Sequence, residues 1–347
     1  MILLQNDYSE GAHERVLEAL QGLGRRQFAG YGEDALSRRA QDLLRQMADM
    51  PQAQLHFVSG GTQANLTVIA SILRPHQGVI AADTGHIATH ETGAVEATGH
   101  KVLEVQHADG KLLPRDIRRL ADEHRADLSF EHTVQPGMVY VSNTTELGSL
   151  YSKAELTAIS ETCRALHLPL FLDGARLGHA MASDGADLGF SDYAQLCDVF
   201  TIGMTKQGAL FGEAIVLTGP ALQRDFRYHI KQRGGMLAKG WLMAAQFLSL
   251  MEEDLYLQLA RHANCQAMRI RDGLKALGVP LLSDSPSNQQ FPILPDAVIA
   301  ALREGFGFNT IQRMDDAHTA VRFVTSWATR EEDVNLLLHK LQALLPR

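Results

Sequence analysis

The fold of this chain is decided by two segments, HLPLFLDGARLGHA (167–180) and DVFTIGMTKQGALFG (198–212). Each contains a short apolar run of strand length that leads into a polar residue, Asp173 in the first segment and Lys206 in the second. Such runs, bounded by turn residues, are typical of central strands in a parallel sheet. Ligands of open α/β sheets bind beyond the carboxyl ends of these strands, so we expect both side chains to face one crevice.

A carboxylate and an amine in one crevice suit the cofactor pyridoxal phosphate. The Lys206 amine can form a Schiff base with the cofactor aldehyde, and Asp173 can keep the pyridine nitrogen protonated so that the ring accepts electrons. Partial burial favours the neutral, reactive form of such a lysine. The alternative interpretation is a structural ion pair that caps two core strands, and these two residues alone leave both open.

The composition indicates a globular enzyme with a core large enough for two lobes. The 347 residues carry a net charge of −8 and contain no run of Lys or Arg, so nucleic acid is not an expected partner. Cys163, Cys197 and Cys265 are too far apart for a metal motif or a disulfide framework, which fits a cytoplasmic protein. No membrane span or signal peptide is expected, because even the apolar run WLMAAQFLSLM (241–251) is short and contains Gln246.

Seven candidate strands alternate with mostly helical segments between residues 56 and 218. They are HFVS (56–59), GVIAA (78–82), KVLEV (101–105), MVYVS (138–142), PLFLD (169–173), VFTIG (199–203) and EAIVL (213–217). This alternation predicts an α/β fold with a mostly parallel seven-stranded sheet and helices on both faces. A short Gly-containing loop precedes EAIVL, which we therefore expect to run antiparallel to VFTIG.

The chain is expected to divide into three parts. Residues 1–30 form an N-terminal arm and a helix, residues 31–277 form a large domain with the site, and residues 278–347 form a smaller C-terminal α+β domain. Asp34 is well placed to cap a helix whose apolar residues follow at helical spacing.

The segment HFVSGGTQANLTVIASIL (56–73) is typical of a strand, a Gly-rich turn and a helix. Gly60 and Gly61 allow the backbone to approach an anion, Thr62 offers a hydroxyl, and the helix N-terminus presents unpaired N–H groups. The segment thus predicts a phosphate cup, although an ordinary strand–helix turn capped by Thr62 would show the same pattern. It matches neither GxGxxG nor GxxxxGK[ST].

Two histidines and an asparagine could reach the same crevice. His86 follows the second strand and could stack on a flat cofactor ring. A metal site with His90 is the rival interpretation, but no familiar ligand motif completes it, and we expect no metal. Asn143 ends the fourth strand and could bond a ring oxygen or simply begin a turn. His132, ahead of that strand, could lean toward the site or be exposed. 

Two arginines could bind the carboxylate of an amino-acid substrate. Arg176 lies three residues beyond Asp173, and Arg322 lies in AVRFVTS (320–326) of the small domain. A guanidinium group binds a carboxylate through two parallel hydrogen bonds. Solvated surface positions are the ordinary alternative for each arginine.

Taken together, these motifs resemble the threonine aldolases, which are fold type I pyridoxal phosphate enzymes related to aspartate aminotransferase. The resemblance spans nearly the whole chain in the same order. The segments that carry it are NDYSE (6–10), YGEDALS (31–37), SGGTQANL (59–66), GHIATHETGA (85–94), SNTTELG (142–148), FLDGARLGHA (171–180) and TIGMTKQGA (201–209). The last two segments are the most specific.

The resemblance implies a role for each matching residue. Lys206 would carry the cofactor, Asp173 would pair with its pyridine nitrogen, and His86 would stack on its ring. Gly61, Thr62 and Gln63 would hold the phosphate. Arg176 and Arg322, helped by Asn6, would bind the substrate carboxylate, and His132 stands where the family has a histidine near the substrate hydroxyl. Tyr31 and Lys231 lie in segments that approach the site partly from a neighbouring subunit. Arg233 is an alternative to Lys231.

Some positions depart from the family pattern. Thr205 and Gln207 flank Lys206 where the family has Ser and Gly, and Asn6 replaces a Ser. The family's Glu-Asn-Thr-His has become Ser142-Asn143-Thr144-Thr145. The cofactor-binding motifs are thus better matched than the residues around the substrate.

The function implied is retro-aldol cleavage of L-threonine, L-allo-threonine or related β-hydroxy amino acids to glycine and an aldehyde. His86 and His132 are the candidate bases for the hydroxyl proton. The alternatives are β-elimination or racemisation of another amino acid, and a non-catalytic amino-acid-binding protein on the same fold. We expect a homo-oligomer, either a dimer or a tetramer, with the site near a subunit interface.

Overall fold

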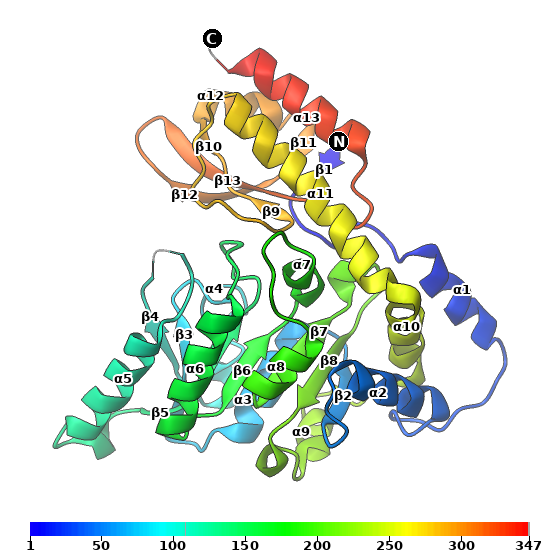
Figure 1. Cartoon of the computed structure of the whole chain (residues 1–347), viewed down its shortest axis with the longest axis vertical. Helices are drawn as coiled ribbons and strands as arrows, with labels where there is room; N and C mark the ends of the chain where they lie inside the picture. Colours follow the sequence, from blue (N-terminus) through cyan, green and yellow to red (C-terminus); the bar gives the residue numbers. More distant parts are fainter. Residues whose placement is uncertain (108, 346–347) are drawn as a thin grey trace.

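A seven-stranded sheet forms the centre of the larger lobe in the computed structural model, which describes residues 1–107 and 109–345 (Figure 1). Its strands are β2 (Gln54–Val58), β3 (Gln77–Ala82), β4 (Val102–Val105), β5 (Gln135–Ser142), β6 (Leu170–Asp173), β7 (Val199–Gly203) and β8 (Glu213–Leu217). The order across the sheet is β2-β8-β7-β6-β5-β3-β4. β8 runs antiparallel to β2 and β7, and the other neighbours are parallel. The predicted sheet, including its reversed last strand, is confirmed.

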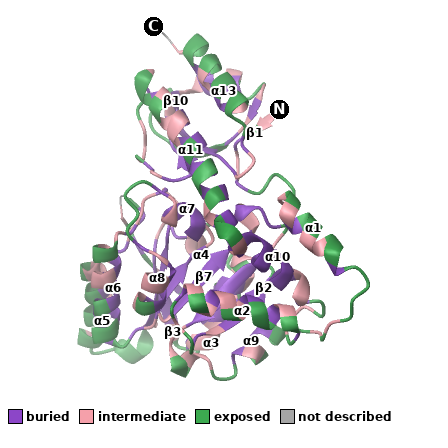
Figure 2. Cartoon of the chain, turned by 45° about the vertical axis from the view of Figure 1, so that its right-hand side comes forward, coloured by how far each residue is buried: buried purple, intermediate pink, exposed green. Residues whose placement is uncertain are grey.

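Helices cover both faces of this sheet. They are α2 (Ala35–Met47), α3 (Gly61–Ile72), α4 (His86–Thr89), α5 (Pro114–Ala126), α6 (Lys153–Leu166), α7 (Leu177–Met181), α8 (Phe190–Leu196), α9 (Phe226–Gln232) and α10 (Trp241–Met251), with α1 (Glu14–Leu23) outside α10. Asp34 caps α2 as expected, because its Oδ1 accepts a hydrogen bond from the Ser37 backbone at 2.8 Å. The burial pattern in Figure 2 follows this layering, with buried strands and exposed outer helix faces.

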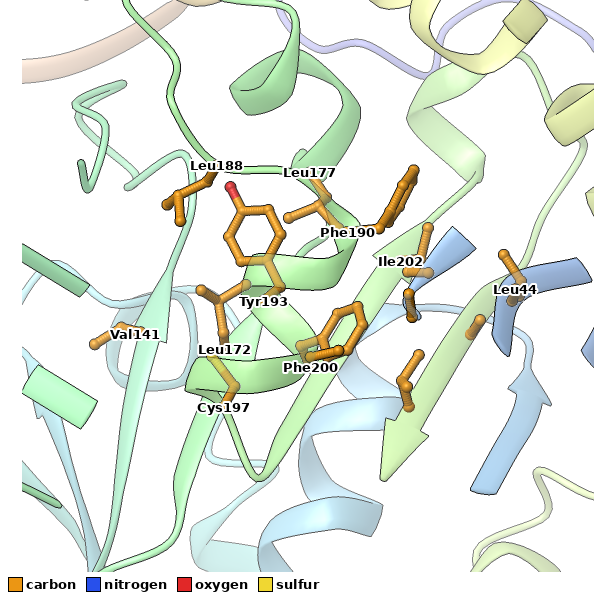
Figure 3. Packing of buried hydrophobic residues seen from close by; sticks show 14 of the residues in the cluster. Leu44, Val141, Leu172, Leu177, Leu188, Phe190, Tyr193, Cys197, Phe200 and Ile202 are labelled. Carbon is orange, nitrogen blue, oxygen red and sulfur yellow. The ribbon is translucent and has the colours of Figure 1, made fainter. Parts of the chain in front are cut away.

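Two hydrophobic clusters, one on each face, hold the helices against the sheet. In β5, Val139 and Val141 belong to one cluster, while Met138 and Tyr140 belong to the other. Successive side chains of a strand point to opposite faces, so a strand covered on both sides must be apolar throughout. Figure 3 shows the first cluster, in which Leu172, Phe200 and Ile202 of the sheet lie beside Phe190 and Tyr193 of α8. This double burial explains why the strands could be read from continuous apolar runs.

The apolar run at 241–251 is a core helix. In α10 every residue from Met243 to Met251 is buried, and the Gln246 Oε1 accepts a hydrogen bond from the Leu210 backbone at 2.9 Å. A helix that is apolar on all sides is one that the protein itself surrounds. Among the described residues, none of the helices combines the length and the apolar character that a membrane crossing needs.

The smaller lobe is built around antiparallel strands near the C-terminus. It contains β9 (Gln289–Gln290), β10 (Ile293–Pro295), α12 (Asp296–Leu302), β11 (Phe306–Gly307), β12 (Asn309–Arg313), β13 (His318–Val324) and α13 (Glu331–Leu344). The long helix α11 (Leu255–Ala276) runs from the large lobe into it (Figure 1). The first strand of the chain, β1 (Ile2–Leu3), pairs in parallel with β11. The arm therefore starts in the small lobe and then crosses to the large one; the boundaries at 30/31 and 277/278 stay predictions.

Candidate active site

A cavity of about 430 Å³ lies at the carboxyl edge of the large sheet. Seven of the residues singled out from the sequence line it: Gly60, Gly61, Thr62, His86, Asp173, Arg176 and Lys206. They come from loops that follow β2, β3, β6 and β7, which are far apart in the chain. The expected crevice at the strand ends therefore exists, and it contains both the amine and the carboxylate.

Asp173 is a buried, fully hydrogen-bonded carboxylate at the end of β6. Its Oδ2 accepts hydrogen bonds from the Tyr140 hydroxyl at 2.6 Å and the Asn65 Nδ2 at 2.9 Å, and its Oδ1 accepts one from the Ala175 backbone at 2.9 Å. Burial alone would raise the pKa of Asp173, but nearby His86 and these hydrogen bonds hold the pKa below its usual value. The group is a fixed negative charge at neutral pH.

Lys206 lies in a single 3₁₀ turn (Thr205–Gln207) directly after β7. Burial and the positive charge of Arg176 lower the pKa of its amine, although Asp7, Asp173 and Glu213 oppose that shift. A lowered pKa increases the share of the neutral, nucleophilic amine. The turn thus presents a reactive amine to the cavity that Asp173 also lines.

The His86 ring is held by a chain of hydrogen bonds that ends at Asp173. Its Nδ1 lies 2.9 Å from Oε1 of the buried Glu91, and that oxygen also accepts a hydrogen bond from Asn65 Nδ2 at 2.8 Å. The same Asn65 amide donates to Asp173. The His90 ring lies beside His86, with centroids 5.7 Å apart and planes inclined by 23°. The ring orientation is fixed in a way that suits stacking on a flat ligand.

The Gly-rich turn before α3 has the features of an anion cup. No side chain caps α3, so the N–H groups of its first turn are free to bind an anion. A Cβ atom at Gly60 or Gly61 would meet no other heavy atom within 4 Å, which shows open space above the turn. Gln63 supports the turn instead of lining the cavity: its Oε1 accepts from the Ser59 backbone at 3.1 Å, and its Nε2 donates to the Arg233 carbonyl at 3.1 Å.

Arg176 is paired with a residue that sequence reasoning missed. Its Nε and Nη2 donate to the two carboxylate oxygens of Asp7 at 2.7 and 3.0 Å. Asp7 is fully buried, and Asn288 of the small lobe also donates to it at 2.9 Å. Burial alone would raise the pKa of Asp7, but Arg176 holds it well below the usual range. The ion pair joins the arm, the large lobe and the small lobe at the cavity wall.

Arg322 approaches from β13 of the small lobe with part of its charge unsatisfied. Its Nη1 donates weakly to the Gln289 Oε1 at 3.3 Å, while its buried Nε has no partner among the described residues. Burial and the neighbouring Arg176 lower its pKa. Arg322 is not among the residues that line the cavity, but it lies near Arg176 and Glu146, which do line it. An incompletely paired guanidinium at this position is suited to a carboxylate ligand.

Within one chain, three residues predicted to act in the site have other surroundings. His132 is exposed and precedes β5, so the eight-residue strand separates it by roughly 26 Å from the cavity edge. The Asn143 side chain is used internally, because it donates to the Tyr193 hydroxyl at 2.9 Å and accepts from the Tyr151 backbone at 3.2 Å. The Asn6 Oδ1 accepts from the Tyr8 backbone at 3.0 Å and from the Ser9 hydroxyl at 2.9 Å, and so shapes the turn that brings Tyr8 to the cavity.

Tyr31 and Lys231 lie outside this cavity. Both are exposed, and the Lys231 Nζ lies 4.7 Å from the centre of the Tyr31 ring. They line a separate surface hollow with Tyr228 and Met236. The Arg233 side chain donates to Gln232 Oε1 at 3.0 Å and is likewise not among the residues lining the cavity. Within one chain, none of these groups completes the site.

Two carboxyl groups that line the cavity were also missed. Glu146 follows β5, and Glu213 begins β8. Burial and nearby Asp173 raise the pKa of Glu213 to about 8, and its buried Oε1 has no partner among the described residues. Because β8 is antiparallel, its first residue lies at the edge where the parallel strands end. A search for polar residues at the carboxyl ends of strands does not find a residue that begins a strand.

The residues of the cavity fit pyridoxal phosphate. A fixed carboxylate, a reactive amine, an oriented imidazole and an anion cup all face one space. The buried Thr144 hydroxyl also lines this space and has no partner among the described residues, so it can receive a polar group of a ligand. No cluster of three potential metal ligands occurs within residues 1–107 and 109–345.

Fold and site together define a fold type I protein of the aspartate aminotransferase class. The aspartate aminotransferase of Thermus thermophilus superimposes with a TM-score of 0.72 at 17% identity, covering 99% of this chain and 92% of that one. The chain belongs to the beta-eliminating lyase family, whose family model matches residues 19–296.

Two relatives cover nearly the whole chain. It is 34% identical over 319 residues to the low specificity L-threonine aldolase of Pseudomonas aeruginosa, covering 91% of this chain and 90% of that protein. The solved structure of Leishmania major threonine aldolase is 44% identical, with a TM-score of 0.96 and 99% coverage of both chains. The resemblance identified from the sequence motifs is therefore confirmed.

Proposed function

We propose that this chain is a pyridoxal phosphate-dependent lyase that cleaves L-threonine, L-allo-threonine or a related β-hydroxy amino acid to glycine and an aldehyde. The observation that carries the proposal is the shared cavity of Asp173, Lys206 and the Gly60–Thr62 turn, with two arginines beside it. The similarity to the two threonine aldolases supports the same reaction class.

The large lobe would hold the cofactor. Asp173 is placed to pair with the pyridine nitrogen, His86 to cover one face of the ring, and the Gly60–Thr62 turn to bind the phosphate. The Lys206 amine would attach to the aldehyde carbon. When bound there, pyridoxal phosphate supplies an electron sink for the charge left at Cα when a bond breaks. Asp173, which its lowered pKa keeps ionised, would help the ring accept these electrons by keeping the pyridine nitrogen protonated.

The arm and the small lobe would hold the amino acid. Arg176 lies close enough to Arg322 to lower the pKa of Arg322, and of these two arginines only Arg176 is paired with a carboxylate. A substrate carboxylate would add the missing negative charge. Holding that carboxylate fixes which bond of Cα is perpendicular to the ring, and therefore which bond breaks.

We further propose that a second subunit completes the assembly. Tyr31, Tyr228 and Lys231 form an exposed, partly aromatic surface, and large exposed aromatic patches are typical of interfaces. Gln63 links this surface to the anion cup through the Arg233 carbonyl. Mixing Lys206→Ala subunits with Tyr31→Ala subunits should restore activity if Tyr31 serves the neighbouring site. A mixture that stays inactive would contradict that role. The cytoplasmic location stays a prediction.

A β-elimination remains a second candidate. The name of the matching family and the replacement of the Glu-Asn-Thr-His motif by Ser142-Asn143-Thr144-Thr145 favour it. The two reactions differ in which bond breaks and in their products.

The deciding experiment is a substrate panel. Purified protein with added pyridoxal phosphate is incubated with L-threonine, L-allo-threonine, D-threonine and L-serine, and aldehyde, glycine, ammonia and 2-oxo acid are measured. We expect glycine and acetaldehyde in equal amounts from the L-threonines. Ammonia and 2-oxo acid without glycine would instead establish elimination, and Lys206→Ala protein supplies the background rate.

A further inference from the structure

Glu146 is one of two acidic side chains of the cavity, with Glu213, that the preceding account gives no role. It follows β5 in the segment SNTTELG (142–148), and it lines the same cavity as Lys206. Its Oε1 accepts hydrogen bonds from the His86 backbone at 3.0 Å and from the Ser142 hydroxyl at 2.9 Å. No other described residue donates a hydrogen bond to Oε2, and this oxygen is not among the fully buried atoms. One oxygen is therefore anchored while the other faces the cavity.

The proposed cleavage needs a proton acceptor that the structure has not otherwise supplied. Breaking the Cα–Cβ bond of a β-hydroxy amino acid requires loss of the hydroxyl proton, and a positioned base accelerates such a step. His132 lies at the opposite edge of the sheet. The His86 ring is tied through Nδ1 to Glu91 and is oriented for stacking.

We propose that Glu146 is the catalytic base that accepts the β-hydroxyl proton of the substrate. This inference rests on the proposed function and assigns a residue to its central step. The hydroxyl proton passes to Glu146 Oε2, and the electron pair of the O–H bond becomes the second bond of the aldehyde carbonyl. The Cα–Cβ bond breaks, and its electron pair stays with the Cα fragment. That carbon then takes a proton to give glycine, and Glu146 returns its own proton to solvent.

The electrostatic surroundings make this carboxylate more basic than usual. Burial raises the pKa of Glu146, His86 lowers it, Asp173 raises it again, and the Ser142 hydrogen bond lowers it. The charged and titratable groups that face it are His86 of α4, Asp173 of β6, Arg176 before α7, Arg322 of β13, and the tyrosines Tyr140 and Tyr151. A base must be ionised to act, so cleavage should fall as the pH drops through this raised pKa.

The first test uses the variant Glu146→Gln, which keeps the shape of the side chain and removes its basicity. It compares cleavage, which needs a base, with a reaction that needs only the cofactor and Lys206. Exchange of the glycine α-proton in D₂O needs the cofactor and Lys206 but no hydroxyl base. We expect the variant to lose cleavage by about 10²- to 10³-fold while glycine exchange changes only a few-fold. Its cofactor absorbance should match the wild type, and Glu146→Asp should recover part of the rate.

The second test uses pH. The acid limb of kcat/KM should disappear in Glu146→Gln. In Ser142→Ala the limb should move to higher pH, because the carboxylate loses a hydrogen bond that favours its charged form. A readout without catalysis is available in the free energy of unfolding. A raised folded-state pKa means that wild-type stability falls, relative to Glu146→Gln, as pH rises through that pKa.

Each contrary outcome has a distinct meaning. Glu146→Gln that cleaves at the wild-type rate, or that loses cleavage and glycine exchange by the same factor, would overturn the assignment while leaving the lyase function standing. Wild-type protein that exchanges the glycine proton but cleaves no β-hydroxy amino acid would overturn the lyase function, and the base assignment with it.

Discussion

The charges on the two sides of the active site differ in how they are paired. The first wall consists of the large-lobe residues that line the cavity, and the second wall is Arg322 of the small lobe, which is not among those lining residues. On the wall from the large lobe, Asp173 accepts three hydrogen bonds and His86 is tied to Glu91. On the wall from the small lobe, Arg322 has a buried Nε without a partner among the described residues. Fully paired groups such as Asp173 are preorganised, whereas an incompletely paired guanidinium gains most when a ligand binds. This difference supports the proposal that the cofactor binds at the first wall and the substrate carboxylate at the second.

The largest expected effect comes from removing the amine of the first wall. Lys206→Ala should abolish covalent attachment of pyridoxal phosphate and reduce turnover on the order of 10⁴-fold or more. Borohydride treatment followed by mass spectrometry detects attachment. Because Asp173, His86 and the cup remain, the variant should still bind the cofactor noncovalently; cofactor still fixed to the variant by borohydride would refute the assignment of this lysine.

A second prediction contrasts two buried carboxyl groups of the same wall. Asp173→Asn removes a charge that is present at neutral pH and should lower kcat by about 10²- to 10³-fold. Glu213→Gln should have a much smaller effect at pH 7, because the pKa of Glu213 is raised to about 8 and the group is then mostly neutral. Steady-state kinetics at pH 7 on both variants makes the comparison, and equal losses would show that geometry rather than charge matters at these positions.

A substitution in the second wall should weaken substrate binding rather than slow the chemical step. Arg322→Ala should raise KM for the amino acid by roughly 10- to 100-fold, because a charge-assisted contact to the carboxylate is lost. The cofactor absorbance should stay as in the wild type. Substrate titrations and the absorbance spectrum are the measurements. A variant with unchanged KM and reduced cofactor binding would reverse the assignment of the two walls.

The smallest effect concerns acid stability, and it should originate in the large lobe. Burial lowers the pKa values of His56 and His179 to about 3. The unfolded chain therefore takes up these protons first, so stability is complete above about pH 6.5 and falls as pH drops from 6.5 toward 3. His56→Phe should reduce the loss by up to about 2 kcal/mol at pH 5, measured by thermal unfolding at pH 5 and pH 7. An unchanged difference between the two pH values would exclude His56 as a contributor.

The large-lobe wall was predictable because its residues follow local patterns. Asp173 and Lys206 each follow an apolar strand, and Gly60–Thr62 stand at the start of a helix. Their positions can therefore be predicted from the few residues around each of them. Parallel strand ends meet at one edge, which brings these separate segments together. Tyr140 and Asn65 escaped notice because they lie within apolar runs that look like ordinary core.

Other parts of the site depend on long-range geometry that no local pattern shows. Asp7 meets Arg176 across 169 positions of sequence, after the arm has paired with a strand near residue 306. His132 was considered for the site from its place ahead of the fourth strand and from the family resemblance, but within one chain a residue that precedes a parallel strand lies at the far edge. Glu213 was missed for the opposite reason, since an antiparallel strand brings its start to the active edge.

The path of the N-terminal arm has a mechanical consequence. β1 pairs with β11 of the small lobe, and only a few residues later Asp7 forms an ion pair with Arg176 of the large lobe. The arm therefore connects the two lobes directly (Figure 1). A movement of the small lobe would therefore be transmitted to Arg176, which we propose binds the substrate carboxylate. Lobe movement and substrate binding would then be coupled through the six residues from Ile2 to Asp7.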